Sequence, residues 1–197
     1  MPQAGQIVYF EDTAQAEDNT RSVVSIVGAY LKTHAAKHVV LASNTGCVAA
    51  QFAPLAKANP KVSFIAVKMA PAVDKIYDVV FDDGYRKIMA DAGIKLVTGT
   101  HALTGGVDRA LRATFDGGFP PSAIIANTLY LFSQGMKVCV EIIAMACDSG
   151  LLPEGVEVIS CAGTGRGSDT AIVATSAAST YLFDLDIHRI LAMPLKK

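Results

Sequence analysis

Hydrophobic positions along this chain follow two patterns, one typical of helices and one of buried strands. In segment 19–34 they recur every three or four residues behind Asn19 and Thr20, either of which can cap a helix, so an amphipathic helix is expected there. The β-branched run 38–42 predicts a buried strand, and the next helical stretch ends before Pro60. A strand, a turn and a helix in this order are typical of a parallel sheet.

The rest of the chain repeats this order. A helix is expected at 82–92, closed by Gly93, and 101–121 is expected to be an irregular, lid-like excursion because of its glycines and paired prolines. Segment 122–150 predicts two helices hinged at Gly135, or one long interrupted helix. The strands expected are 7–11, 38–42, 61–69, 94–99, 156–163, 170–175 and 187–194. These elements favour a three-layer α/β/α sandwich in a single domain spanning residues 1–197.

Composition argues against several classes of partner. The 17 basic and 18 acidic residues leave a net charge of −1, which gives no electrostatic reason to expect nucleic acid or an anionic membrane. The longest apolar run, 138–147, is interrupted by Glu141 and is shorter than the roughly 20 residues of a membrane span. The first residues show no secretory leader, and the cysteines lack metal-ligand spacing, so a cytoplasmic protein with reduced thiols and no metal is expected.

The turn Ser43–Gly46 lies where the strand 38–42 ends and a helix begins. The hydroxyls of Ser43 and Thr45, together with Asn44, Gly46 and the first amides of that helix, can bind a phosphate group. The same residue types are also ordinary helix caps, so this turn alone leaves both interpretations open.

A glycine-rich segment, GTGRGSDT, occupies residues 163–170. Its glycines at alternate positions allow positive φ angles and close backbone approach, so successive amides can hold an anion beside the planar donor Arg166. The alternative is a sharp connection between two strands in which Arg166 pairs with Asp169. The spacing matches neither of the common nucleotide-binding glycine motifs. The candidate residues of this loop are Gly163, Thr164, Gly165, Arg166, Gly167, Asp169 and Thr170.

Position favours ligand binding at both turns. In an open parallel sheet, ligands lie beyond the carboxyl ends of the strands, where the strand order reverses. Both turns follow such ends, and so does the segment after strand 94–99, with Thr100, His101 and Thr104. Three polar turns on one edge therefore predict a cleft for a phosphate-bearing small molecule.

Two residues near this edge could take part in chemistry. His101 can act as a general acid or base or as a ligand contact, although an exposed loop histidine is the simpler explanation. Glu141 is the one carboxylate of an apolar stretch, so it needs a cation such as Lys137 or Arg166, or it meets the ligand. Cys47 is interpreted as a small packing residue.

Four segments of the chain resemble a known family. They are ASNTG, KVCVEIIAMACDSG, GTGRGSDTA and the C-terminal MPLKK, and they are similar to the stand-alone pyruvate kinase C-terminal-domain-like proteins, also called the pyruvate kinase alpha/beta domain. The resemblance covers nearly the whole chain, from Phe10 to the end, and implies a three-layer α/β/α fold with a mostly parallel five-stranded sheet and an antiparallel edge strand. In full-length pyruvate kinases the equivalent domain is regulatory, and a turn like Ser43–Gly46 binds a phosphate of a sugar-phosphate effector.

The resemblance also implies a ligand. The loop 163–167 would close over the same ligand, and the site suits flavin mononucleotide (FMN), whose ring needs a flat apolar wall. Pyruvate kinase activity is not expected, because its separate (β/α)₈ barrel of about 250 residues is absent. We therefore expect a small-molecule-binding protein with a phosphate or FMN site, with catalysis left open. The alternatives are a flavin-dependent oxidoreductase or phosphate-ester hydrolase using His101 or Glu141, and a regulatory or interaction module; a homo-oligomer also stays open.

Overall fold

The computed structural model describes residues 6–72, 76, 78–115 and 120–196. Seven strands form one sheet in the order β1-β7-β6-β5-β2-β3-β4. They are β1 (Val8–Phe10), β2 (His38–Ala42), β3 (Ser63–Met69), β4 (Lys95–Gly99), β5 (Glu157–Ala162), β6 (Thr170–Thr175) and β7 (Asp186–Pro194). The helices described below are α1 (Ala16–Thr33), α2 (Cys47–Ala58), α4 (Asp83–Asp91), α5 (Gly106–Thr114), α6 (Pro121–Leu129), α7 (Gln134–Asp148) and the 3₁₀ helix η1 (Ser179–Asp184).

The sheet is mostly parallel, as expected, but it differs from the expected sheet in two respects. It has seven strands instead of five, and its antiparallel strand, β6, lies inside the sheet between β5 and β7 instead of at an edge. The reason is that β7 pairs with β6, and β1 then pairs in parallel with β7. Two strands thus extend the sheet beyond β6.

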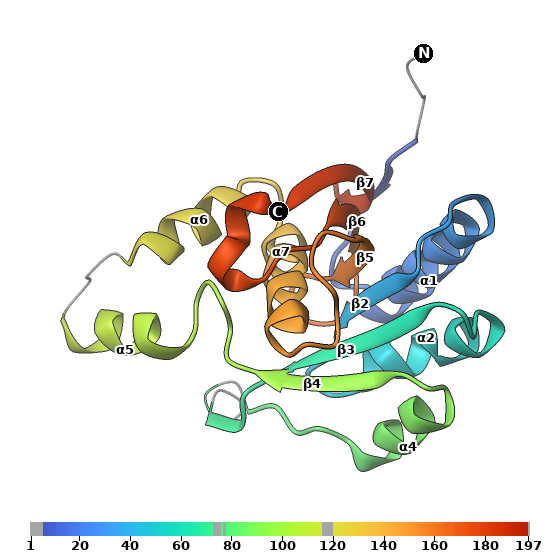
Figure 1. Cartoon of the computed structure of the whole chain (residues 1–197), viewed down its shortest axis with the longest axis horizontal. Coiled ribbons are helices and arrows are strands. Elements are labelled where there is room, and N and C mark those ends of the chain that lie inside the picture. The colour runs from blue at the N-terminus through green and yellow to red at the C-terminus, as the bar shows by residue number, and fades with distance from the viewer. Residues whose placement is uncertain (1–5, 73–75, 77, 116–119, 197) are drawn as a thin grey trace.

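Helices cover both faces of the sheet (Figure 1). On one face, α1, α2 and α4 pack on the strands through a core that includes Val27, Phe52 and Met89. On the other face, α7 and η1 pack on the same sheet, with Ile143 among the buried residues. Because β2 and β3 have apolar side chains on both faces, their sequences are nearly continuous hydrophobic runs.

Helix α7 is the most buried helix of the described structure, and its beginning corrects the expected hinge. The chain leaves the helical path between α6 and α7, and Gly135 is the second residue of α7. A Cβ atom at Gly135 would lie 2.1 Å from Thr170 Oγ1, so this glycine permits a close contact between α7 and β6. Ser133 caps the helix by accepting a hydrogen bond from the Met136 amide.

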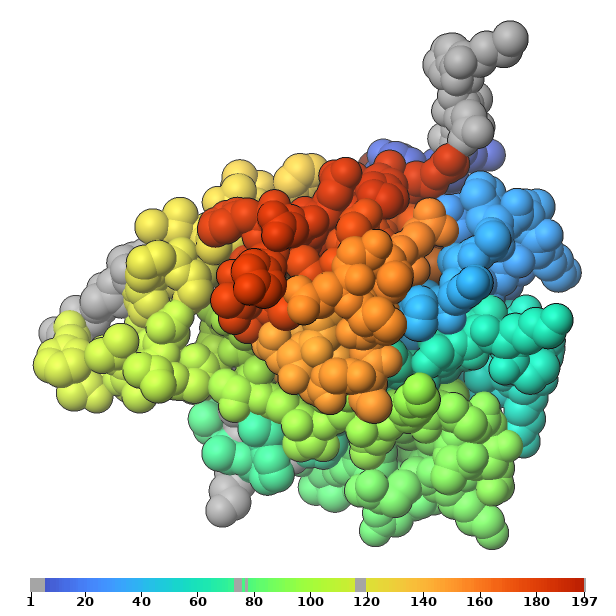
Figure 2. Space-filling model, viewed as in Figure 1, coloured from blue at the N-terminus to red at the C-terminus, as the bar shows by residue number. Residues whose placement is uncertain are grey.

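Two other expectations need correction. Helix α1 begins at Ala16, so Asn19 and Thr20 lie inside it and do not cap it; Thr20 instead accepts a hydrogen bond from the Ser168 amide. The excursion 101–121 contains a regular helix, α5, none of whose residues is buried, while its residues 116–119 lie outside the described part. Helices α5 and α6 form the projection at the left of Figure 2. No helix among the described residues is both long enough and apolar enough to cross a membrane.

Candidate functional site

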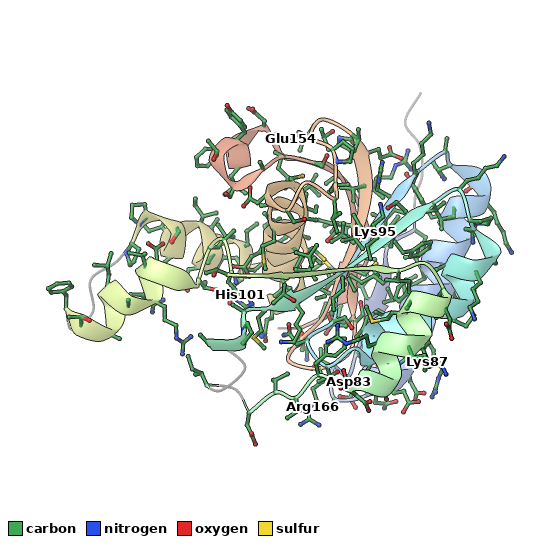
Figure 3. All side chains as sticks on the ribbon, turned by 60° about the horizontal axis from the view of Figure 1, so that its bottom comes forward. Asp83, Lys87, Lys95, His101, Glu154 and Arg166 are labelled. Atoms are coloured by element: carbon green, nitrogen blue, oxygen red, sulfur yellow. The ribbon has the colours of Figure 1, made fainter. Side chains whose placement is uncertain are left out.

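A cleft of about 810 Å³ opens beyond the carboxyl ends of the central strands. The chain runs from β2 outward through β3 to β4, and then returns through α7 to β5 on the other side of β2. The strand order therefore reverses between β2 and β5, which is where ligands bind in open α/β sheets. The turn after β2 and the loop after β5 both line the cleft. In Figure 3, His101 and Arg166 lie beyond these strand ends, away from Lys95, the first residue of β4.

The cleft brings together most of the residues that the sequence singled out. Those that line it are Ser43, Asn44, Thr45, His101, Thr104, Glu141, Gly163, Gly165, Arg166 and Gly167. Those that do not line it are Gly46, Thr100, Thr164, Asp169 and Thr170. Of the second group, Thr164, Asp169 and Thr170 form hydrogen bonds that shape the glycine-rich loop.

Side chains of the turn Ser43–Gly46 are largely engaged within the fold. Ser43 Oγ accepts from the Ala49 amide at 3.0 Å, and Thr45 Oγ1 accepts from the Cys47 amide at 3.3 Å. Asn44 Oδ1 accepts from the Met69 amide at 3.0 Å and ties the turn to β3. The first amides of α2 are therefore less available to a ligand than the sequence suggested. The hydroxyls of Ser43 and Thr45 still have a proton each to donate.

The glycine-rich loop connects β5 and β6 as a hairpin, and Asp169 fixes its shape. The carboxylate of Asp169 is 2% exposed and accepts from the Thr164 amide at 2.9 Å and from Thr170 Oγ1 at 2.7 Å. Gly167 has a φ of +69°, and a Cβ atom on it would lie 2.4 Å from the Ala16 carbonyl oxygen. Asp169 and Thr170 therefore belong to the frame of the loop.

Arg166 does not pair with Asp169, contrary to the alternative considered from the sequence. It is exposed, lines the cleft and forms no ion pair with any residue that the structure describes. The Thr164 and Arg166 amides bond within the loop, so the remaining backbone donors of the loop are those of its glycines. This end of the cleft thus offers a guanidinium group that is not ion-paired with a described residue, while the carboxylates of Glu17 and Asp78 line other parts of the cleft wall.

A buried ion pair forms the floor of the cleft. Glu141, 1% exposed, accepts from Lys137 Nζ at 2.5 Å, so Lys137 and not Arg166 is the cation that pairs with it. The other carboxylate oxygen of Glu141 accepts from the amides of Leu103 and Thr104 at 2.9 and 3.2 Å. Glu141 therefore also fastens the loop after β4 to α7.

Lys137 and His101 flank this carboxylate. Lys137, 2% exposed, donates to Thr104 Oγ1 at 2.7 Å and lies 5.9 Å from the centre of the Tyr130 ring. His101 Nδ1 lies 3.6 Å from Glu141 Oε2, and the ring is 25% exposed. Burial lowers the pKa of His101; Glu141 opposes that effect, and the positive charges of Lys137 and Arg109 add to it. Burial therefore favours the neutral form of the imidazole.

Several lining residues were not identified from the sequence as site residues. Apolar side chains on β3 and α7, including Met69, Ile142 and Met145, give the cleft an apolar wall. Tyr130 and Gln134 also line it, and no sequence pattern marks them. Lys137 did carry a signal, because it stands one helical turn before Glu141 in an apolar helix, yet it was considered only as a partner for that glutamate. Cys47 lines the cleft as well.

The described residues contain no group of three or more histidine, cysteine, aspartate or glutamate side chains that could hold a metal ion. No protein-family model matches the chain. Chemically, the cleft can bind an anion at the end that holds Arg166. At its floor, a cation and a neutral imidazole can contact polar groups of the same molecule.

Proposed function

We propose that this protein binds a phosphate-bearing small molecule in the cleft between the Ser43–Gly46 turn and the Gly163–Gly167 loop. The observation that carries this proposal is the exposed guanidinium of Arg166, which lines a cleft of about 810 Å³ at the reversal of strand order. The hydroxyls of Ser43 and Thr45 line the same cleft and can donate to phosphate oxygens. A volume of this size is in the range of ligand and cofactor sites.

FMN is the specific ligand that we propose, and the lining residues fit it. Arg166, Ser43 and Thr45 would hold the phosphate, and the apolar wall that includes Met69 and Met145 would contact the ring. FMN would supply hydride or electron transfer at this place. The strands β4, β3, β2, β5 and β6 adjoin one another in the sheet, with the antiparallel β6 last, in keeping with the proposed relationship to pyruvate kinase C-terminal-like domains.

The test is a titration of the purified protein with FMN, followed by flavin fluorescence, together with native mass spectrometry of the protein as isolated. We expect FMN binding that Arg166→Ala weakens by about tenfold, since a charge-assisted hydrogen bond contributes roughly 1.5–3 kcal/mol when buried and less at an exposed site. The matched control is Lys57→Ala, which removes a positive charge from the opposite end of α2. Absence of FMN binding at high micromolar protein would remove FMN as the ligand.

A second candidate function, catalysis, is favoured by one observation. His101 is partly exposed, lines the cleft beside a buried cation and has a pKa lowered by burial, which favours the neutral form that a general base needs. Glu141 is a poorer base, because both of its oxygens accept hydrogen bonds from the protein. An oxidoreductase or phosphate-ester hydrolase would lose turnover but retain ligand binding in His101→Ala. Equal loss of both would assign His101 to binding.

A further inference from the structure

Lys137 has more hydrogen-bond donors than the protein uses. An ammonium group carries three N–H donors. Within the described part of the chain it has two acceptors, Thr104 Oγ1 at 2.7 Å and Glu141 Oε2 at 2.5 Å. Lys137 also lines the cleft. One donor of a buried cation is therefore left for a molecule bound there.

The ion pair is a costly way to fill this position if it serves only the fold. Apolar side chains of similar volume are often as stabilising as a buried ion pair, or more so. The surrounding part of α7 is apolar, with Val140, Ile143 and Ala144 all buried. A charge at this place is therefore better explained by what the cleft holds than by packing. Glu141 accepts from Lys137 through one oxygen and from the Leu103 and Thr104 amides through the other, so it acts as the residue that positions Lys137.

His101 offers the complementary group. In a neutral imidazole one nitrogen donates and the other accepts, and a nearby carboxylate favours the proton on the nitrogen that faces it. The nitrogen that faces Glu141 is Nδ1, at 3.6 Å from Oε2. The other nitrogen, Nε2, is then an acceptor on the opposite edge of a ring that lines the cleft. Because Lys137 and His101 Nδ1 approach the same carboxylate oxygen, the ammonium group and the imidazole ring lie beside each other at the floor of the cleft.

We propose that Lys137 and His101 recognise the lactam or imide edge of a planar heterocycle, in which a C=O group stands next to an N–H group. Lys137 donates to the carbonyl oxygen and His101 Nε2 accepts from the ring N–H. The ligand is thus a phosphorylated heterocycle bound at both ends of the cleft. This inference rests on the proposed function for the phosphate end and adds the class of group held at the floor.

Four probes separate the two ends: FMN, riboflavin, 3-methyl-FMN and inorganic phosphate. Riboflavin lacks the phosphate, 3-methyl-FMN lacks the imide N–H, and phosphate lacks the ring. Each is titrated by calorimetry against wild type, His101→Phe, Arg166→Ala and the double variant Lys137→Met/Glu141→Gln, which removes both charges together. Circular dichroism establishes that each variant is folded.

In wild type we expect 3-methylation to weaken FMN binding roughly tenfold, the effect of one lost hydrogen bond. In His101→Phe, FMN and 3-methyl-FMN should bind with equal affinity, since the variant lacks the Nε2 acceptor for the imide N–H. The double variant should weaken FMN and riboflavin by a similar factor and leave phosphate unchanged. Arg166→Ala should do the reverse, weakening FMN and phosphate and sparing riboflavin.

Four results would overturn parts of this reasoning. If 3-methyl-FMN binds wild type as tightly as FMN, or the double variant weakens phosphate as much as riboflavin, the assignment of Lys137 and His101 is wrong. If the wild type binds inorganic phosphate but neither FMN nor riboflavin, recognition of a heterocycle edge is refuted, while the proposed phosphate site at Arg166 stands. If wild type binds none of the probes, the proposed function itself fails.

Discussion

Replacing Lys137 with methionine should destabilise the protein strongly, because it leaves the buried negative charge of Glu141 without its ion-pair partner. Methionine matches the length of the lysine stem and keeps its packing, but Glu141 Oε2 loses the ammonium group that lies 2.5 Å from it. The carboxylate is 1% exposed, so water cannot replace the ammonium group without opening the structure. Removing one partner of a buried ion pair typically costs about 3–5 kcal/mol.

The double variant Lys137→Met/Glu141→Gln sets the scale of this effect. A glutamine carbonyl can still accept from the Leu103 and Thr104 amides, which bond to Glu141 Oε1 in the wild type. With no charge left unpaired, we expect the loss to fall below about 2 kcal/mol, so the double variant should be more stable than Lys137→Met alone.

The assay is urea unfolding at pH 7, followed by far-ultraviolet circular dichroism because the chain has no tryptophan. A domain of this kind has about 5–15 kcal/mol of stability, so a loss of 3–5 kcal/mol moves the midpoint far. The reasoning would be refuted if Lys137→Met lost less than about 1 kcal/mol, or if the double variant were no more stable than the single one.

Four further predictions follow from particular contacts. Gly135→Ala should lower the free energy of unfolding in urea by about 1–2 kcal/mol, because the clash of its Cβ with Thr170 outweighs a gain in helix propensity of about 1 kcal/mol. An unchanged urea midpoint would contradict the close contact between Gly135 and Thr170. Asp169→Ala should lower the free energy of unfolding by about 1–3 kcal/mol and weaken phosphate binding, since the Thr164 amide loses its acceptor. If calorimetry shows that the folded variant binds phosphate as tightly as the wild type, Asp169 does not shape the loop for binding. The pKa of His101 is lowered in the folded protein, so as the pH falls the unfolded chain takes up this proton first. The contribution of His101 to the free energy of unfolding is therefore fully present above pH 6.5 and is lost as the pH falls. In His101→Asn the free energy of unfolding should accordingly depend less steeply on pH between pH 7 and 5. Of the four thiols, Cys47 alone should react with Ellman's reagent in the native protein, because the other three are buried; a second fast thiol would count against the packing of α7 and β5.

The sequence predicted every strand of the sheet, because each is a short apolar or β-branched run bounded by turn residues. What it could not predict is how the last strands join. Whether β7 adds beyond β6, with β1 outside it, depends on long-range backbone pairing such as that of Phe10 with Pro194. The number five came from the resemblance, and the local pattern was the better guide.

Site residues were predictable where the reason for them is local. The turn Ser43–Gly46 and the loop Gly163–Gly167 follow strand ends, so their place in one cleft followed from the fold class. The sequence did not show, however, which side chains of these loops face the cleft and which hold the loop backbone. Asp169 holds the loop, because its oxygens accept from the neighbouring Thr170 hydroxyl and from the Thr164 amide across the loop, and the sequence does not show which way the carboxylate points. Polar residues of one loop look alike in sequence, whether they face a ligand or the backbone.

One helix holds both ends of the cleft. At the start of α7, Ser133 Oγ lies 3.3 Å from Thr170 Oγ1, and Thr170 donates to Asp169, which shapes the glycine-rich loop. One turn farther along, Lys137 stands on the floor of the cleft. The distance between the end of the cleft that holds Arg166 and the floor that holds Lys137 is thus fixed by a buried helix and by hydrogen bonds to it. A ligand held at both ends needs little rearrangement of the protein, which favours affinity and makes the cleft selective for the length of the molecule that bridges it.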